Sequence, residues 1–207
     1  MRAIFQQRCM MGLVISCLLW FSTLVSAADS QSVVVLKESA QEMIHMLKAN
    51  QGKLHNPSFL HAQVRKIVLP RFDLTVMAQS IVGRNHWSRA TPAQRAEFIR
   101  QFSSLVISVY SAPLADYNGD QVQFMPQRSE SGSRSVVHTQ IIRPTGQKIA
   151  VIYQMLQSGG TWKVYDFSIE GISMVSSYRA QFADVLQSQG MTGLLAELRQ
   201  HHNRSVS

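Results

Sequence analysis

The sequence is poor in cysteine and in charged side chains. Two of its 207 residues are cysteine, and charged residues make up 15% of the chain, against roughly 25% in an average soluble protein. Because 45% of the residues are apolar, this composition excludes a disordered acidic or basic tail and leaves enough hydrophobic material for a packed core. A chain of this length commonly forms one domain.

The N-terminal segment has the pattern of a secretory signal peptide. Arg2 and Arg8 precede an uncharged, largely apolar run that ends in the small residues Val25-Ser26-Ala27. We expect cleavage after Ala27, with Ala28 as the second choice, so that residues 28–207 form a single exported domain. Two alternatives remain open: an uncleaved membrane anchor, and a lipoprotein, since Val14-Ile15-Ser16-Cys17 resembles a lipobox.

Both cysteines, Cys9 and Cys17, fall inside this segment. The exported part can therefore form neither a disulfide nor a thiolate metal site. Removing Arg2 and Arg8 leaves 18 basic and 12 acidic residues, and the basic residues occur singly or in pairs. A nucleic-acid site needs a dense basic stripe, so we expect no nucleic-acid partner, although weak attraction to anionic lipids is physically reasonable.

Catalytic and cofactor motifs are missing as well. The chain has no Gly-rich phosphate loop, no paired-histidine metal motif and no nucleophile elbow, and its seven histidines are scattered. We therefore expect no cofactor and no metal. Asp166 and Glu170, near Tyr165, are the best candidates for a general base. A structural role is favoured for both, because a carboxylate at a strand end normally accepts backbone amides or pairs with an arginine such as Arg179.

The first half of the exported part is predicted to be helical, over residues 33–113. Apolar positions recur with helical spacing over 33–48, 61–69 and 72–81, with a break at Pro70, an end at Gly83 and a loop up to Arg89. Thr91-Pro92-Ala93-Gln94 predicts a capping box and the start of a long helix. That helix carries an apolar stripe running up to Pro113, formed by Phe98, Phe102, Leu105, Val106, Val109 and Tyr110.

An antiparallel sheet is predicted over residues 121–170. A short strand at 122–124 is followed by strands at 135–143, 148–156 and 161–169, which are separated by turn sequences at 144–146 and 158–160. Both faces of 149–156 are mostly apolar, which predicts a sheet covered on both sides, by helices on one side and by cargo on the other. Gly171 ends the sheet, and C-terminal helices are expected over 172–200, with a break at Gln189-Gly190.

Several motifs together resemble the MlaC family of periplasmic phospholipid-binding proteins, also called toluene-tolerance auxiliary proteins. Any one motif is weak, but their order and spacing over nearly the whole exported part are specific. They are Leu69-Pro70-Arg71-Phe72-Asp73 with Gly83 and Trp87, Ala90-Thr91-Pro92-Ala93-Gln94-Arg95 with Phe98 and Phe102, Trp162-Lys163-Val164-Tyr165-Asp166, and Glu170-Gly171-Ile172-Ser173-Met174-Val175 with Tyr178-Arg179 and Phe182.

The resemblance implies an α+β fold, in which a curved antiparallel sheet packs with helices around an apolar lipid pocket, in a cone-shaped, NTF2-like outline. It also implies a non-enzymatic periplasmic carrier that shuttles phospholipid between the outer and inner membranes and maintains outer-membrane lipid asymmetry. The implied partners are an inner-membrane ABC transporter complex with a mammalian-cell-entry domain and an outer-membrane lipoprotein–porin complex. Two other functions remain open: a small-molecule isomerase or hydratase on a cone-shaped fold, and a periplasmic protein-binding adaptor with a solid core.

Combined with the periodicity, the resemblance predicts which side chains line the lipid pocket. On the long helix these are Phe98, Phe102, Val106, Val109 and Tyr110. On the sheet they are Val151, Tyr153, Phe167 and Ile169, with Ile172 and Val175 closing the rim.

Overall fold

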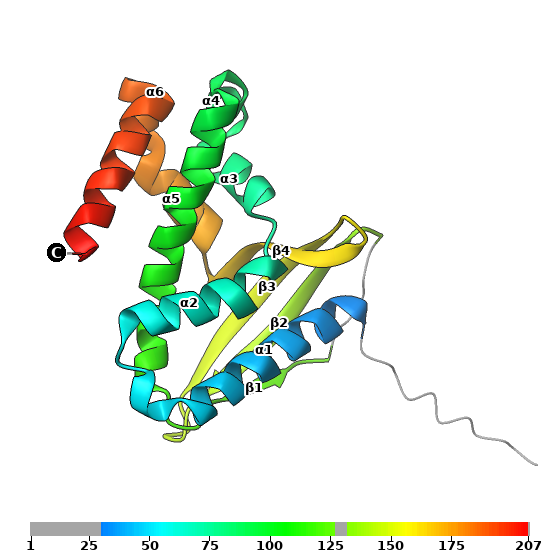
Figure 1. The fold of residues 1–207 in the computed structure, drawn as a ribbon. Coiled ribbons are helices and arrows are strands. Elements are labelled where there is room, and N and C mark those ends of the chain that lie inside the picture. The colour runs from blue at the N-terminus through cyan, green and yellow to red at the C-terminus, as the bar shows by residue number, and fades with distance from the viewer. Residues whose placement is uncertain (1–29, 127–131, 207) are drawn as a thin grey trace, which may run out of the picture.

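The computed structural model describes residues 30–126 and 132–206. The predicted signal peptide, residues 1–27, lies outside these ranges. Along the described chain, a group of helices is followed by a five-stranded sheet and then by a C-terminal helix (Figure 1). The predicted α+β order, in which the sheet lies between two helical parts, is confirmed.

The N-terminal helices follow the predicted apolar spacing closely. Asn56 caps the second helix by accepting a hydrogen bond from the Phe59 amide, and Gly83 ends the third helix with a φ of 80°. The loop expected before Arg89 is wrong, because a helix of six residues forms there and buries Trp87. The elements are α1 (Gln31–Ala49), η1 (Gln51–Lys53), α2 (Pro57–Ile67), η2 (Leu69–Arg71), α3 (Leu74–Val82) and α4 (Arg84–Arg89).

The predicted capping box begins the longest of these helices, α5 (Pro92–Ser111). The Gln94 amide donates to the Thr91 hydroxyl at 3.2 Å, and the Gln94 side chain accepts from the Thr91 amide at 2.9 Å. The two bonds satisfy donors that an uncapped helix start would leave without partners. A short 3-10 helix, η3 (Ala112–Asp116), follows α5 and leads to the sheet.

The sheet is an antiparallel meander in which each strand pairs with its sequence neighbour. Its strands are β1 (Gln121–Phe124), β2 (Arg134–Ile142), β3 (Lys148–Ser158), β4 (Thr161–Ile169) and β5 (Ile172–Ser173). Two details differ from the prediction. The register of β3 against β4 shifts between Gln154 and Met155, and the meander continues past Gly171 into the two-residue strand β5.

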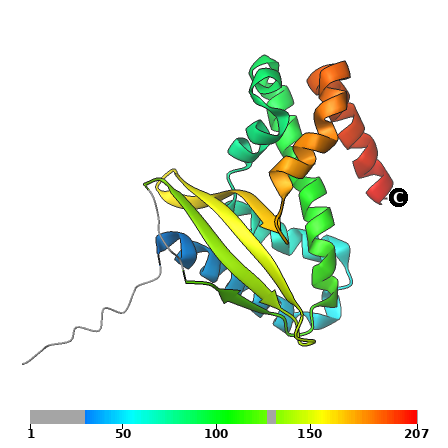
Figure 2. The same cartoon turned by 180° about the vertical axis from the view of Figure 1, so that it is seen from behind.

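The helical cover and the expected cargo space lie on the same side of the sheet. α1 and α2 cross one face (Figure 1), while the opposite face, seen from behind in Figure 2, carries no helix from the described ranges. On that outer face Val136 is 44% exposed. The expectation of helices on one face and cargo on the other is therefore wrong. The apolar side chains of β3 alternate between an inner face, under the helices, and an outer face that is partly exposed.

The C-terminal helix, α6 (Met174–Val206), bends at the predicted break. Gly190 has φ 62° and ψ −159°, which is not helical, and the helix resumes after it. The second part carries buried Leu194, Leu195 and Leu198 and continues six residues past the predicted end at residue 200.

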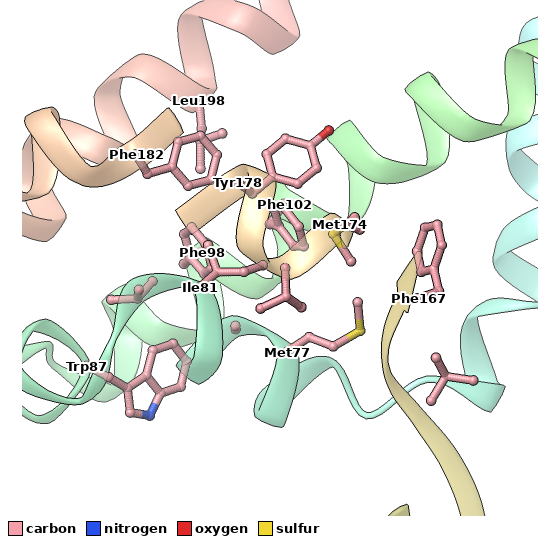
Figure 3. Packing of buried hydrophobic residues seen from close by; sticks show 14 of the residues in the cluster. Met77, Ile81, Trp87, Phe98, Phe102, Phe167, Met174, Tyr178, Phe182 and Leu198 are labelled. Carbon is pink, nitrogen blue, oxygen red and sulfur yellow. The ribbon is translucent and has the colours of Figure 1, made fainter. Parts of the chain in front are cut away.

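Two hydrophobic clusters stabilise this fold. The larger cluster joins α3, α5 and α6 to the sheet, and Figure 3 shows the rings of Phe98, Phe102, Tyr178 and Phe182 gathered between α5 and α6. Phe98 stacks on Phe102 at 5.6 Å, and the Tyr178 ring meets Phe102 edge-on at 5.0 Å. The smaller cluster lies where α1, η1 and α2 meet the end of η3, and contains Met43, Met46, Leu47, Leu54, Leu60, Ile67 and Tyr117.

Candidate functional site

An apolar cavity of about 340 Å³ lies between the helical cover and the inner face of the sheet. This volume is within the range of ligand pockets, about 300–1,000 Å³. Nearly all of its lining is aliphatic or aromatic. The lining includes Leu36, Ala40, Met43, Ile44 and Leu47 of α1, Val64 of α2, Phe102, Val106, Ile107 and Tyr110 of α5, and Val122, Phe124, Ile141, Val151, Tyr153, Phe167 and Ile169 of the strands.

The cavity exists because the two hydrophobic clusters do not merge. Leu36, Met77 and Phe102 of the larger cluster form part of the wall, and Met43, Leu47 and Tyr117 of the smaller cluster form another part. Well-packed interiors contain few voids larger than a water molecule. An apolar void of this size is therefore a site for an apolar guest.

Seven of the eleven side chains predicted to line the pocket lie in the cavity wall. These are Phe102, Val106, Tyr110, Val151, Tyr153, Phe167 and Ile169. They come from α5, β3 and β4. The pairing of β3 with β4 and the position of α5 place these side chains around one cavity. Tyr153 and Phe167 are direct partners across the β3–β4 ladder, and the Tyr110 ring meets Phe167 edge-on at 5.2 Å.

The other four predicted side chains lie outside the cavity wall. Phe98 is fully buried and packs against Phe182, because the first half of α5 faces α6 rather than the cavity. Val175 is buried in the larger cluster at the start of α6. Val109 and Ile172 face solvent, with 48% and 70% of their surface exposed, so Ile172 and Val175 do not form the rim that we expected.

Sequence reasoning did not assign the α1 face or β1 to the pocket. The helical spacing of Leu36, Ala40, Met43 and Leu47 was recognised, but periodicity alone does not say that this face closes a cavity. Val122 and Phe124, which alternate along β1, carry the same ambiguity. In both cases the sequence shows an apolar face but does not show which part of the chain packs against it.

The polar groups of the wall are few. Arg71 and Asp120 are its charged residues among the described ranges. The Tyr117 hydroxyl is buried and has no hydrogen-bond partner within those ranges. Burial raises the pKa of Tyr110 and Tyr153, and it raises the pKa of the neighbouring Tyr178 to about 12, with a smaller contribution from Tyr110. Tyrosine is neutral at physiological pH even when exposed, and burial disfavours the charged form further, which suits an apolar guest.

The acidic residues considered for catalysis hold backbone in place. Asp166 is buried and accepts hydrogen bonds from the Ser173 hydroxyl at 2.6 Å and the Val175 amide at 3.1 Å. Glu170 accepts from the Ala150 amide. These contacts fit the favoured structural reading of both carboxylates.

Arg179 and Tyr165, which the sequence places near these carboxylates, bond to other groups. Arg179, one candidate partner for Asp166 or Glu170, instead donates to the Ser80 carbonyl at 2.8 Å. The Tyr165 hydroxyl bonds to Gln154 at 2.9 Å. Gln154 points away from the cavity, because it follows Tyr153 in a strand.

Two further structural findings concern the described ranges. Across residues 30–126 and 132–206, no three His, Cys, Asp or Glu side chains group closely enough to hold a metal ion. Within the same ranges, every helix is too short or too polar to cross a membrane.

The fold and the cavity together define a class of protein that binds an apolar ligand between a curved sheet and a helical cover. The particular family follows from comparison with known proteins: residues 37–200 match the family model described as MlaC protein, and the chain belongs to this family. The resemblance identified from the sequence motifs is thereby confirmed.

Relatives and a solved structure agree with this assignment. The chain is 23% identical over 189 residues to the intermembrane phospholipid transport system binding protein MlaC of Haemophilus influenzae, covering 89% of this chain and 88% of that protein. It is 29% identical over 171 residues to the toluene tolerance protein ttg2D of Pseudomonas putida, covering 82% and 79%. The fold matches a phospholipid-binding protein of Ralstonia solanacearum, solved in complex with a phospholipid, with a TM-score of 0.79 and 28% identity over 87% of this chain and all of that one.

Proposed function

We propose that this protein is a periplasmic phospholipid carrier that moves lipid between the outer and inner membranes. The observation that carries the proposal is the apolar cavity between the sheet and its helical cover. The Ralstonia solanacearum protein with the same fold was solved with a phospholipid bound, and the Haemophilus influenzae relative is named as part of a phospholipid transport system.

The physical task of such a carrier explains an apolar cavity. A phospholipid with two acyl chains has about 30 methylenes, and exposing each to water costs about 0.8 kcal/mol, so an uncovered lipid would cost on the order of 20 kcal/mol in transit. A wall of aliphatic and aromatic side chains replaces the contacts that the chains make in a bilayer. Extraction and release are then nearly balanced, and the carrier itself needs no chemical step.

The location and the partners belong to the same proposal. The signal-peptide pattern of residues 1–27 supports export, and the family assignment supports delivery between an outer-membrane lipoprotein–porin complex and an inner-membrane ABC transporter with a mammalian-cell-entry domain. A cavity open at one side would leave the headgroup near water, which supports low selectivity among headgroups.

The proposal is tested by filling the cavity. Val106 lies in the wall, so Val106→Trp places an indole where acyl chains would lie. We expect the purified variant to fold but to yield several-fold less phospholipid than the wild type on solvent extraction and mass spectrometry. Val151→Trp tests the opposite wall in the same way.

A matched control lies three residues along the same helix. Val109 is exposed and outside the wall, so Val109→Trp is expected to retain the wild-type amount of lipid. A folded Val106→Trp protein that carries as much lipid as Val109→Trp would contradict the proposal, and so would a wild-type protein that yields no lipid.

A further inference from the structure

We propose that Arg71 binds the phosphate group of the carried phospholipid at the edge of the cavity. This inference rests on the proposed function and adds a polar subsite to a wall that is otherwise apolar. The shared chemistry of all phospholipid ligands is a phosphodiester anion, whatever the headgroup beyond it. When the acyl chains fill the cavity, the phosphate lies at its open side, where a cation at the edge of the wall can bind it.

The charges of the wall indicate where the anion belongs. Within the described ranges, Arg71 is the cation and Asp120 the anion of the wall. Asp120 lies near Tyr117, whose pKa is raised mainly by burial and further by the negative charge of Asp120. An anion near Asp120 would be repelled, whereas Arg71 offers a planar guanidinium that can bind two phosphate oxygens at once.

Arg71 is held in place by its backbone. It ends the short helix η2, where its amide donates to the Val68 carbonyl at 3.0 Å. The next two residues join the sheet: Phe72 forms a parallel bridge with Val164, and the Asp73 amide donates to the Val164 carbonyl at 2.8 Å. The guanidinium therefore extends from a fixed point between the helical cover and β4.

A carboxylate now lies where the phosphate would approach. Glu38 of α1 is 3.9 Å from the Arg71 guanidinium, and the two side chains are 60% and 33% exposed. An exposed pair at this distance contributes little to stability. A phosphate, tethered by acyl chains already in the cavity, can therefore displace Glu38 from Arg71 at small cost.

The experiment compares two lipids that share their acyl chains. Phosphatidylglycerol carries a phosphate and diacylglycerol does not, and each is measured by displacement of a fluorescent fatty-acyl probe from the delipidated full chain. Arg71→Gln is expected to weaken phosphatidylglycerol binding by about tenfold or more, in line with a lost charge-assisted hydrogen bond, and to leave diacylglycerol binding unchanged. Arg71→Lys, which keeps the charge, is expected to restore part of the difference.

A second variant keeps the test informative if Arg71→Gln does not fold. Glu38→Gln removes the competing carboxylate, so it is expected to strengthen phosphatidylglycerol binding and to leave diacylglycerol binding unchanged. Arg65→Gln is the matched control, because Arg65 is exposed on α2 outside the wall. It should behave as the wild type with both lipids.

The results separate this inference from the proposed function. Wild-type protein that binds neither lipid contradicts the carrier itself. Wild-type protein that binds both lipids, combined with an Arg71→Gln variant that weakens both equally or neither, overturns the phosphate site alone. Two other outcomes also overturn it. One is that Lys37→Gln, and not Arg71→Gln, loses the preference for phosphatidylglycerol over diacylglycerol, since Lys37 lies beside a neighbouring hollow. The other is that inorganic phosphate binds to Arg71 as strongly as the lipid does.

Discussion

Asp166 shows how a single side chain can look catalytic in a sequence and be structural in the fold. It is 7% exposed, and it accepts hydrogen bonds from Ser173 of β5, directly before α6, and from the Val175 amide in the first turn of α6. A helix start leaves amide donors without partners inside the helix, and a nearby carboxylate satisfies them and complements the helix dipole.

Replacing this carboxylate should therefore affect stability and not lipid binding. We expect Asp166→Ala to lower the free energy of unfolding by about 1–3 kcal/mol, because the buried Val175 amide loses its partner. Denaturant unfolding of the delipidated protein measures this loss. Asp184→Ala, an exposed acidic residue further along α6, is the control and should change little; lipid loss from a fully stable Asp166→Ala protein would contradict the structural role.

Two phenylalanines of α5 show what the sequence could predict about the site and what it could not. Phe98 and Phe102 lie one helical turn apart in one apolar stripe, yet Phe98 is sealed between α5 and α6 while Phe102 also reaches the cavity wall. Periodicity defines which side of a helix is apolar. It does not define what lies opposite, because that depends on distant elements such as α1 and α6.

At the scale of elements, the predictions succeeded where the signal was local. The capping box of α5 and the turn sequences between strands depend on neighbours in the chain, and both were located correctly. Two of the errors fall on elements too short to show a period. α4 has six residues and β5 has two. Trp87 of α4 is buried in the larger cluster, and β5 pairs with the end of β4.

The bend in α6 gives a prediction for an element. Gly190 has φ 62° and ψ −159°, a conformation essentially restricted to glycine, so Gly190→Ala is expected to cost on the order of 1–3 kcal/mol of unfolding free energy. If the Gly190→Ala variant relieved this strain by forming a straight helix, Leu194 and Leu198 would leave the larger cluster.

The matched control for this change is Gly52→Ala. Gly52 does not have a positive φ, and an added methyl group there meets nothing within 4 Å. Thermal melts of the two variants should therefore differ by several degrees, with Gly52→Ala close to the wild type. Equal melting temperatures would show that the bend is not held by the Gly190 conformation.

At the scale of the whole molecule, the cavity between two hydrophobic clusters links stability to cargo. A ligand that binds the native state at a hundred times its Kd adds about 2.7 kcal/mol, which corresponds to roughly 5–10 °C for a domain of this size. We expect the lipid-loaded protein to melt higher than the delipidated protein by about this amount, as measured by calorimetry at equal protein concentration.

Hydrogen exchange should locate the same effect. Amides of α1 and α2 are expected to exchange faster after lipid removal, because these helices line the cavity, whereas amides in the first half of α5, which faces α6, should be unaffected. Uniform protection in both states would show that lipid does not support the helical cover. Apolar periodicity alone did not predict this cavity, because the cavity is a space between two clusters; the expectation of a pocket came from the family resemblance.

The position of α1 also has a consequence for how the molecule assembles. The Ser32 hydroxyl on α1 hydrogen-bonds with the Ser135 hydroxyl on β2 at 2.8 Å, although 103 positions separate them in the sequence. By contrast, β2, β3 and β4 each pair with the strand next to them in the sequence. Local hairpins form before distant contacts, whose loop closure is costly. α1 should therefore dock over the inner face of the sheet after the hairpins have formed, so that closure of the cavity is a late step of folding.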